Sequence, residues 1–183
     1  MDSNYVKKVQ ELKSKIKSYS DFPKKGILFW DIFSAISDGP TCKLLQGLLV
    51  ETIRTKYPDV EAVVGLESRG FLFSFSVAAE LGIACLPVRK KGKLPGEVLS
   101  HQYDLEYGSD VLEIQKSSIH PGLKCLIIDD LLATGGSIAT ASKLLQACGA
   151  NVLGSLVIIE LTSLKGRKNI PEDISVHSLI TYD

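Results

Sequence analysis

Residues 123–137, which read LKCLIIDDLLATGGS, contain the pattern that decides the fold of this chain. The stretch begins as a short apolar run between Pro121-Gly122 and a pair of aspartates. Apolar runs of this length are typical of strands in a parallel sheet, which are buried on both faces. Small residues follow, and residues 138–148 then have helical spacing before Gly149, a residue type that commonly ends helices. The pattern therefore predicts a buried strand, a tight loop and a helix.

The loop between this strand and this helix has the chemistry of a sugar phosphate site. Backbone N–H groups at a helix start, here from about Thr134 to Ser137, suit a phosphate, and the two hydroxyls add donors. Asp129 and Asp130 have the wrong charge for phosphate, but their carboxylates suit ribose hydroxyls or Mg²⁺. The alternative is an ordinary turn that ends a strand. The glycine spacing excludes a Rossmann fingerprint, and the lack of a closing Gly-Lys-Ser/Thr excludes a P-loop.

The composition predicts one globular domain without membrane spans. The chain has 183 residues, which suits one domain, and 45% of them are hydrophobic. Its 21 basic and 21 acidic residues cancel, so we expect no nucleic acid partner and no anionic membrane surface. The four cysteines are not spaced as a metal knuckle or a redox pair, and the first residues lack a signal-peptide pattern. We therefore expect a cytoplasmic protein.

Apolar strand patterns alternate with helical patterns on both sides of the deciding stretch. The expected elements are helices over 40–57 and 71–81 and strands over 61–65, 83–88, 111–115, 152–161 and 175–181. The last of these strands alternates more between apolar and polar residues, which favours the edge of a sheet. No internal repeat or linker is visible. The pattern therefore predicts one α/β domain.

The N-terminal part of the chain is less regular. Residues 5–16 have apolar residues at helical spacing with lysines on the other faces, which predicts an amphipathic helix. Residues 21–26 break this helix, and residues 34–40 are expected to form a turn region. The apolar and aromatic segment Ile27–Phe33 lies between them and is too short for a helix. It is either core or a lid that stacks on a flat ligand.

Two further loops carry charge where strands are expected to end. Residues 67–70, Glu-Ser-Arg-Gly, lie at a strand-to-helix junction, where an arginine can fork onto phosphate oxygens. The alternative is that Arg69 pairs with Glu67. Arg89–Gly96 has four cations in five residues, and we expect it to form an irregular, mobile flap with the residues up to Tyr103. These cations either solubilise the surface or neutralise a phosphate-rich leaving group.

Residues 129–137 resemble the phosphoribosyl pyrophosphate (PRPP) binding motif of the type I phosphoribosyltransferases. Five segments together are similar, in order and spacing, to the adenine phosphoribosyltransferase family: Glu67–Phe71, Arg89–Gly96, Leu105–Gly108, Asp129–Ser137 and Glu160–Arg167. The likeness covers the chain from Phe22 to about Tyr182. It implies the type I phosphoribosyltransferase fold, a mostly parallel, twisted sheet flanked by helices, as a single domain over 1–183. It further implies an N-terminal helix and base-pocket hood over 1–35 and a flexible flap over 89–108.

The resemblance implies a purine salvage enzyme that converts adenine and PRPP to AMP and pyrophosphate. Its cofactor is expected to be Mg²⁺, bound mainly through PRPP and without a firm protein ligand. The residues implied to hold the 5′-phosphate and ribose are Asp129, Asp130, Ala133, Thr134, Gly135, Gly136 and Ser137. Those implied to bind pyrophosphate are Glu67, Ser68, Arg69, Arg89, Lys90 and Lys93, with a non-proline cis peptide near Glu67-Ser68-Arg69.

The resemblance also implies the base site and the assembly. Glu106 would be the catalytic residue that accepts a proton from the purine's imidazole ring. The alternative for Glu106 is a salt bridge to a lysine of the flap. The adenine contacts would be Leu28, Trp30 and Leu131. A homodimer is expected, in which Arg89 reaches the neighbouring site.

Two positions depart from the family pattern. Trp30 stands where the family usually has arginine, and Ser74-Phe75 stands where Gly-Pro is common. Two alternatives therefore stay open. One is a phosphoribosyltransferase for another purine base, and the other is a catalytically silent PRPP-binding paralogue or regulator.

Overall fold

The computed structural model describes residues 3–104 and 109–183. Its internal contacts divide the chain into two compact units, Met1–Thr52 and Ile53–Asp183, called here the N-terminal and the C-terminal unit. The prediction of a single domain with a hood over 1–35 stays a prediction. Each unit is described by itself below.

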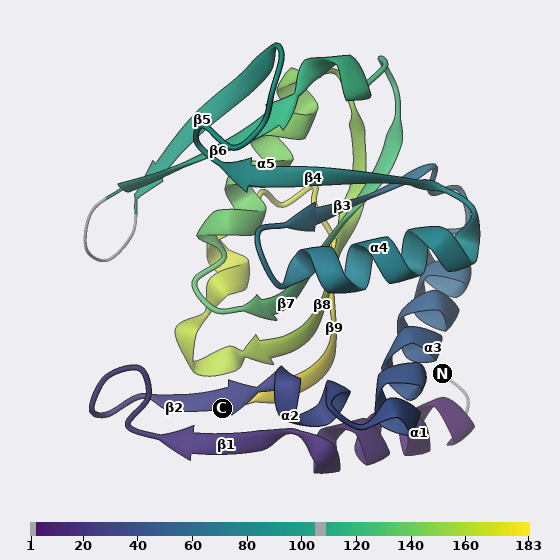
Figure 1. The fold of residues 1–183 in the computed structure, drawn as a ribbon, viewed down its shortest axis with the longest axis vertical. Coiled ribbons are helices and arrows are strands. Elements are labelled where there is room, and N and C mark those ends of the chain that lie inside the picture. The colour runs from purple at the N-terminus through teal and green to yellow at the C-terminus, as the bar shows by residue number, and fades with distance from the viewer. Residues whose placement is uncertain (1–2, 105–108) are drawn as a thin grey trace. The chain divides into compact units, whose positions relative to one another are not determined.

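The N-terminal unit contains helices and a two-stranded hairpin (Figure 1). Its elements are α1 Ser3–Lys15, β1 Lys17–Ser20, β2 Leu28–Asp31, α2 Ile32–Ile36 and the first part of α3 Gly39–Lys56. The predicted amphipathic helix is confirmed, since α1 buries Tyr5 and Leu12. The Tyr5 hydroxyl lies 2.7 Å from the Thr52 hydroxyl of α3. This hydrogen bond joins the two helices inside the unit.

The segment around the hairpin differs from its predicted structure. β1 pairs antiparallel with β2. Its four residues are all exposed, so the sequence has no alternation of apolar and polar residues that would predict a strand here. Part of the expected turn region is the helix α2, because the Asp31 side chain accepts a hydrogen bond of 3.0 Å from the Phe33 N–H and caps the first turn. Within Ile27–Phe33, Ile32 is buried, but Ile27, Leu28 and Phe33 are exposed. The core alternative is therefore wrong for these three residues.

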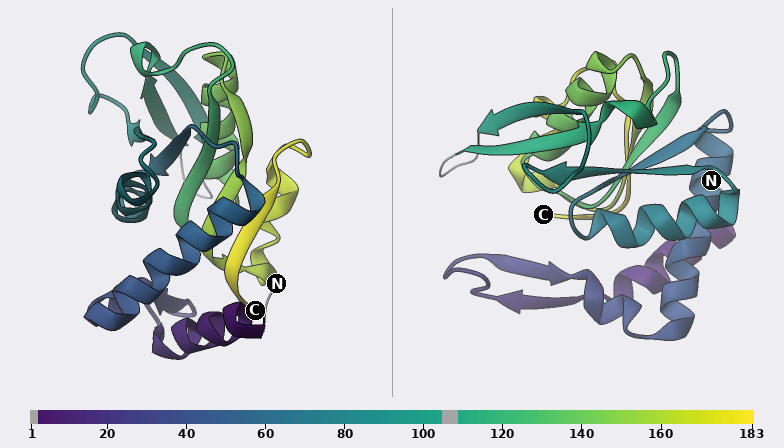
Figure 2. Two further views of the ribbon diagram at one scale, coloured as in Figure 1. Left: turned by 90° about the vertical axis from the view of Figure 1, so that its right-hand side faces the viewer. Right: turned by 45° about the horizontal axis from the view of Figure 1, so that its top comes forward.

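The C-terminal unit is built on a seven-stranded sheet in the order β5-β6-β4-β3-β7-β8-β9 (Figures 1 and 2). The strands are β3 Ala62–Leu66, β4 Ala84–Lys90, β5 Val98–Asp104, β6 Ser109–Gln115, β7 Lys124–Leu132, β8 Asn151–Leu161 and β9 Val176–Tyr182. Parallel pairing joins β4, β3, β7, β8 and β9 in this spatial order. β6 pairs antiparallel with β4 on one side and with β5 on the other. The predicted α/β class and mostly parallel sheet are confirmed.

Helices cover both faces of this sheet. α4 (Gly70–Leu81) packs on β3 and β7, and α5 (Gly136–Ala147) lies on the opposite face, as the right view of Figure 2 shows. Gly82, with φ +67°, ends α4, as expected for a glycine in this position. Short 3₁₀ helices complete the unit: η1 Lys116–Ser118, η2 Thr162–Leu164 and η3 Gly166–Asn169. Among the described residues, no helix has the length and apolar character needed to cross a membrane.

Two strand boundaries correct the predictions. β7 continues through the aspartates to Leu132 because it stays paired with β8, where Leu132 lies opposite Glu160. The residues from Val98 to Tyr103 form the strand β5, so this part of the predicted flap has regular structure, and its mobility stays a prediction. A strand over 111–115 and an edge strand over 175–181 are confirmed as β6 and β9.

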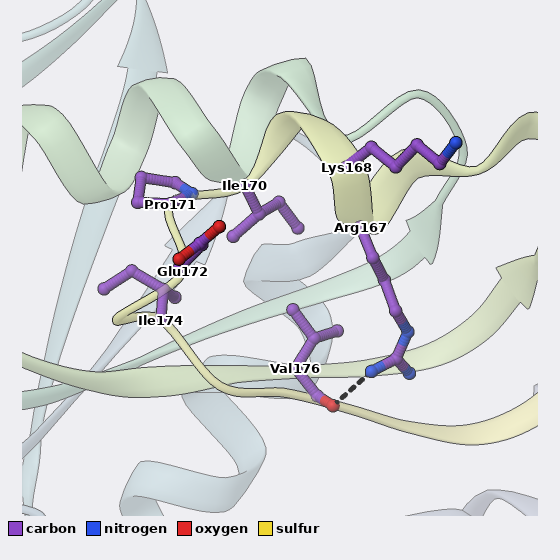
Figure 3. Close-up of a pocket in the computed structure, with 7 residues that line it drawn as sticks. All are labelled: Arg167, Lys168, Ile170, Pro171, Glu172, Ile174 and Val176. Carbon is purple, nitrogen blue, oxygen red and sulfur yellow. Dashed lines mark hydrogen bonds between the residues drawn. The ribbon is translucent and has the colours of Figure 1, made fainter.

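A buried carboxylate anchors the chain after β8. Arg167 of η3 donates two hydrogen bonds to Glu160, from Nε at 2.7 Å and from Nη2 at 2.6 Å. The Arg167 Nη1 group also donates to the Val176 carbonyl at 2.8 Å, so the side chain spans from η3 to β9 (Figure 3). These Arg167 hydrogen bonds hold the pKa of Glu160 below its usual range. The pair lies beside a cavity of about 490 Å³ that Ile170, Pro171, Ile174 and Val176 also line.

We expect Arg167→Met to lower the free energy of unfolding by about 2 kcal/mol, because the buried Glu160 carboxylate then loses its charged donor. Urea denaturation at pH 7 measures this loss. The double variant Glu160→Gln/Arg167→Met removes the unpaired charge and should regain part of the stability. Equal losses in the single and double variants would show that the charge pairing is unimportant.

Candidate active site

Three loops meet at one edge of the sheet in the C-terminal unit. β3 is a parallel neighbour of β4 on one side and of β7 on the other. The chain leaves these three strands through residues 67–69, 91–97 and 133–135. In open α/β sheets, ligands bind at the carboxyl ends of the strands. Three segments that were predicted separately from the sequence therefore lie along one edge.

The loop after β7 has the form expected of an anion cradle. Ala133–Gly135 connects β7 to α5, and Gly135 has φ +84°, a left-handed conformation that favours glycine. No side chain caps α5. The first N–H groups of a helix have no carbonyl partner within it, so those at Gly136 and Ser137 can donate to a ligand.

The 3₁₀ helix η3 packs against this loop and supports it. A Cβ on Gly166 would overlap the Ala133 carbonyl oxygen, and a Cβ on Gly135 would overlap the Gly166 carbonyl oxygen. The Asn169 side-chain amide donates to the Thr134 carbonyl at 2.8 Å, across 35 positions of sequence. No local pattern in the sequence predicts Gly166 or Asn169 as supports of the loop, because the contact joins residues far apart in the chain.

The two aspartates occupy different environments although they are adjacent. Asp130 is buried and forms an ion pair of 2.7 Å between its Oδ2 atom and the Arg69 Nε atom. Asp129 is half-buried, and burial together with the negative charge of Asp130 raises its pKa well above the usual value. Gly70 passes close to this strand, since a Cβ there would lie 2.8 Å from the Ile128 carbonyl oxygen. The close approach lets the loops after β3 and β7 meet.

Glu67 binds cationic residues at the end of β4 and just after it. Its carboxylate accepts hydrogen bonds from Lys93 Nζ at 2.7 Å, from the Lys90 N–H at 2.9 Å, and from two Arg89 nitrogens at 3.3 Å each. The Glu67 side chain is only 10% exposed. Burial by itself would raise the Glu67 pKa, but these donors outweigh it and lower that pKa from 4.5 to about 2. The charged Glu67 carboxylate therefore holds the segment from Arg89 to Lys93 in place through these hydrogen bonds.

Lys90 has a different acidic partner, Asp110 of β6, at 3.0 Å. The four cations predicted to bind pyrophosphate are thus each paired with a carboxylate: Arg69 with Asp130, Arg89 and Lys93 with Glu67, and Lys90 with Asp110. The alternative that Arg69 pairs with Glu67 is wrong. Asp110 was not singled out from the sequence, where it is one acid among several in a charged segment.

Other predictions for the site differ in their outcome. The Glu67–Ser68 peptide is cis, which confirms the expectation of a non-proline cis peptide, and the Ser68 residue is exposed. Leu28 and Trp30 lie on β2 of the N-terminal unit, and Leu131 is half-buried on β7 of the C-terminal unit. Their adenine contacts stay predictions. Glu106 lies outside the described residues, so its catalytic role also stays a prediction.

The edge of the sheet can therefore hold a ligand that has both phosphates and a diol. Backbone N–H groups and hydroxyls after β7 suit one phosphate, and four clustered cations suit a second, more highly charged group. The carboxylates of Asp129 and Asp130 lie near the end of β7, shortly before the loop Ala133–Gly135 (called here the phosphate loop), and can accept hydrogen bonds from hydroxyls.

Comparison with known proteins agrees with this chemistry. A family model described as a phosphoribosyl transferase domain matches residues 34–181. The chain is 55% identical over 175 residues to an adenine phosphoribosyltransferase of Drosophila pseudoobscura pseudoobscura, with 96% of each chain covered. It is 46% identical over 172 residues to that of Rhodospirillum rubrum, covering 94% of this chain and 98% of the relative.

Solved structures show the same likeness in three dimensions. The adenine phosphoribosyltransferase of Saccharomyces cerevisiae, in complex with an imino-altritol bisphosphate and adenine, superposes with a TM-score of 0.91 at 40% identity. The match covers 95% of this chain and 99% of the yeast chain. The enzyme of Thermoanaerobacter pseudethanolicus matches with a TM-score of 0.90, also at 40% identity and with the same coverage.

We expect Glu67→Gln to lower the free energy of unfolding at pH 7, because the surrounding cations lose their carboxylate partner. The loss should be only about 1 kcal/mol, because solvent partly screens these cations. The folded-state pKa of Glu67 is lowered, so its stabilisation is complete above pH 4.5 and is lost as the pH falls toward about 2. Urea denaturation of both proteins between pH 7 and pH 2 measures the effect. The difference should shrink through this window, and a constant difference would contradict the assigned pKa.

Proposed function

The chain belongs to the adenine phosphoribosyltransferase family, and on that premise we propose that it transfers the phosphoribosyl group of PRPP to adenine, giving AMP and pyrophosphate in purine salvage. The observation that carries the proposal is the meeting of a phosphate loop, two carboxylates and four cations at one sheet edge. These groups match the phosphate, the diol and the pyrophosphate of PRPP.

The loop after β7 would hold the ribose 5′-phosphate. The N–H groups and hydroxyls from Ala133 to Ser137 would donate to its oxygens. Asp129 and Asp130 would accept hydrogen bonds from the ribose hydroxyls and would stabilise the positive charge that develops on the ring as the anomeric bond breaks. Arg69 supports this role, because its ion pair with the buried Asp130 fixes the orientation of that carboxylate.

The cations would neutralise the pyrophosphate as it leaves. Arg69, Arg89, Lys90 and Lys93 are already gathered by carboxylates, so binding exchanges carboxylate oxygens for phosphate oxygens. This exchange avoids the cost of assembling four like charges at the moment of reaction. Preorganised charge of this kind is usually the largest contribution to catalysis. In the same proposal, the exposed Ser68 would offer its hydroxyl to the pyrophosphate.

The base would be enclosed by Leu28, Trp30 and Leu131, and Glu106 would accept a proton from its imidazole ring as a general base. The exposed apolar side chain of Leu28 supports the lid alternative for the segment Ile27–Phe33, since a flat base would cover such a surface.

Mg²⁺ is the proposed cofactor, and the residues present fit it. Two carboxylates are adjacent at Asp129 and Asp130; burial and then the negative charge of Asp130 raise the Asp129 pKa, and a bound cation would stabilise the charged form of the pair. No cluster of three potential metal ligands occurs in the described part of the chain. Mg²⁺ commonly uses one or two carboxylates together with substrate phosphates, which supports binding mainly through PRPP. The bound ion would supply positive charge to the diphosphate.

A homodimer is part of the proposal. α4 presents Leu72 and Phe75 to solvent, at 52% and 70% exposure, which is unusual for large apolar side chains on one helix. On the same helix, the Phe71 ring lies 5.9 Å from the Arg89 guanidinium, so the apolar face adjoins a pyrophosphate-binding cation. A second copy on this face would bring Arg89 near the neighbouring site.

A cytoplasmic location is supported by the four cysteines, all of them described, which are free thiols.

AMP formation from adenine and PRPP with Mg²⁺, measured beside guanine and hypoxanthine, tests the function. We expect turnover with adenine alone. Glu106→Gln should lower kcat by about 100-fold or more, since general bases contribute this much, and Asp129→Asn/Asp130→Asn should abolish turnover. Turnover with another purine would indicate altered base selectivity, and Trp30→Arg would then test its origin. PRPP binding without turnover on any base would indicate a silent binder.

We expect Phe75→Glu to shift the protein from dimer to monomer, because a carboxylate on the apolar face must lose its hydration in the interface. Analytical ultracentrifugation at micromolar concentration measures the shift. Glu80→Gln, an exposed change near the other end of α4, is the matched control and should leave the dimer intact. A wild-type monomer, or a Phe75→Glu dimer of unchanged stability, would reject this interface.

A further inference from the structure

We infer that Glu113 is a positioning residue that fixes the turn of the cation-bearing loop Arg89–Gly96, called here the cation loop, and thereby sets the affinity for pyrophosphate and PRPP. The inference rests on the proposed function, because it assigns a support to the residues that would bind pyrophosphate. Glu113 belongs to none of the segments that indicated the family.

Glu113 lies at the centre of the strands that carry the cation loop. It is on β6, which is placed between β4 and β5 in the sheet (Figure 1). In the strand register Glu113 is opposite Arg89 on one side and Ser100 on the other. The cation loop connects β4 to β5, so it must pass over the end of β6. Glu113 is therefore placed to hold the loop at its midpoint.

The side chain makes this connection directly. Its Oε2 atom accepts a hydrogen bond of 2.8 Å from the Gly92 N–H, and its Oε1 atom accepts one of 3.1 Å from the Ser100 hydroxyl. Gly92 lies in the first turn of the cation loop and has φ +78°, as does Gly96 at the end of the loop. A bond at Gly92 fixes the direction in which the chain enters and leaves the turn, and with it the neighbouring lysines.

The Glu113 carboxylate is buried, which is energetically unfavourable for a charged group. Glu113 is 4% exposed, yet it forms no ion pair with any cation in the described parts of the chain. A buried carboxylate without a cation is costly, and glutamine or an apolar residue would be easier to accommodate in a strand. A charged acceptor, however, forms a stronger hydrogen bond to a backbone N–H than a neutral one does. The energetic cost of burying the Glu113 carboxylate is explained if the cation loop needs a strong hydrogen bond at the Gly92 N–H.

The cations depend on the geometry of this turn. Lys90 and Lys93 lie on either side of Gly92 and reach different acids, Asp110 and Glu67. Backbone pairing of the cation loop with β6 ends before the turn, where the Lys91 N–H donates to the Val111 carbonyl at 3.1 Å. Beyond that point the Glu113 carboxylate holds the turn, together with the Arg89 Nη1 group, which donates to the Lys93 carbonyl at 3.1 Å. Without Glu113, the ligand would have to order the turn between the two lysines, which weakens binding.

The test compares three variants with the wild-type protein. Glu113→Ala removes both hydrogen bonds, Glu113→Gln keeps the shape but removes the charge, and Ser100→Ala is the matched control that removes only the bond to β5. We expect Glu113→Ala to raise the KM for PRPP and the dissociation constant for pyrophosphate by about tenfold, which corresponds to about 1.4 kcal/mol. Glu113→Gln should fall between this variant and the wild type. The KM for adenine should change by less than about twofold in all three, and Ser100→Ala should resemble the wild type.

Hydrogen–deuterium exchange of the peptide over 89–96 gives a readout that does not need activity. We expect faster exchange of this peptide in Glu113→Ala and unchanged exchange in the peptide over 124–132. Unchanged exchange over 89–96, or equal losses for PRPP and adenine, would overturn the inference. A wild-type protein that neither turns over adenine nor binds pyrophosphate, while exchange over 89–96 still depends on Glu113, would instead overturn the proposed function and the ligand part of the inference.

Discussion

The parallel pairing of β3 with β7 is the constraint on which the site depends. It brings the ends of the two strands together, although the loops that follow them are far apart in sequence. Glycines let α4 pack closely on this strand pair: Gly65 of β3 leaves no room for a Cβ against Ser74 of α4, and Gly70 passes close to the Ile128 carbonyl oxygen of β7. Ser74 is fully buried, and its hydroxyl donates a hydrogen bond of 3.3 Å to the Phe71 carbonyl. The polar group that this serine brings into the core is therefore satisfied within α4.

Charge compensation is the second organising feature of the site. A cluster of cations without partners would repel itself and would bind counter-ions from solvent. Here Glu67, Asp110 and Asp130 hold the cations in place with ion pairs of 2.7 to 3.3 Å. In the proposed function, a phosphate-rich ligand would therefore meet cations that are already oriented, and the acids would become available to hydroxyls or to a metal ion as the ligand took their place.

The supports of the site come from segments that carry no obvious function. η3 supports the phosphate loop through Gly166 and Asn169, and Arg167 connects η3 to Glu160 of β8 and to the Val176 carbonyl of β9. Glu113 does the same for the cation loop from β6. Each support lies one layer behind the groups that would touch the ligand. Mutations there should change how well the binding groups are oriented rather than their chemistry.

The sequence by itself determined the fold class, the order of the main helices and strands, and the strand–loop–helix unit over 123–148, because hydrophobic periodicity and glycine positions are local signals. It also identified the charged segments that meet at the sheet edge. Only the tertiary structure decided that β7 runs on to Leu132, that residues 98–103 form a strand, and that Ile27, Leu28 and Phe33 are exposed. The same holds for the choice of acidic partner for each cation. These features depend on strand pairing and on contacts between residues distant in the chain, which leave no periodic trace in the sequence.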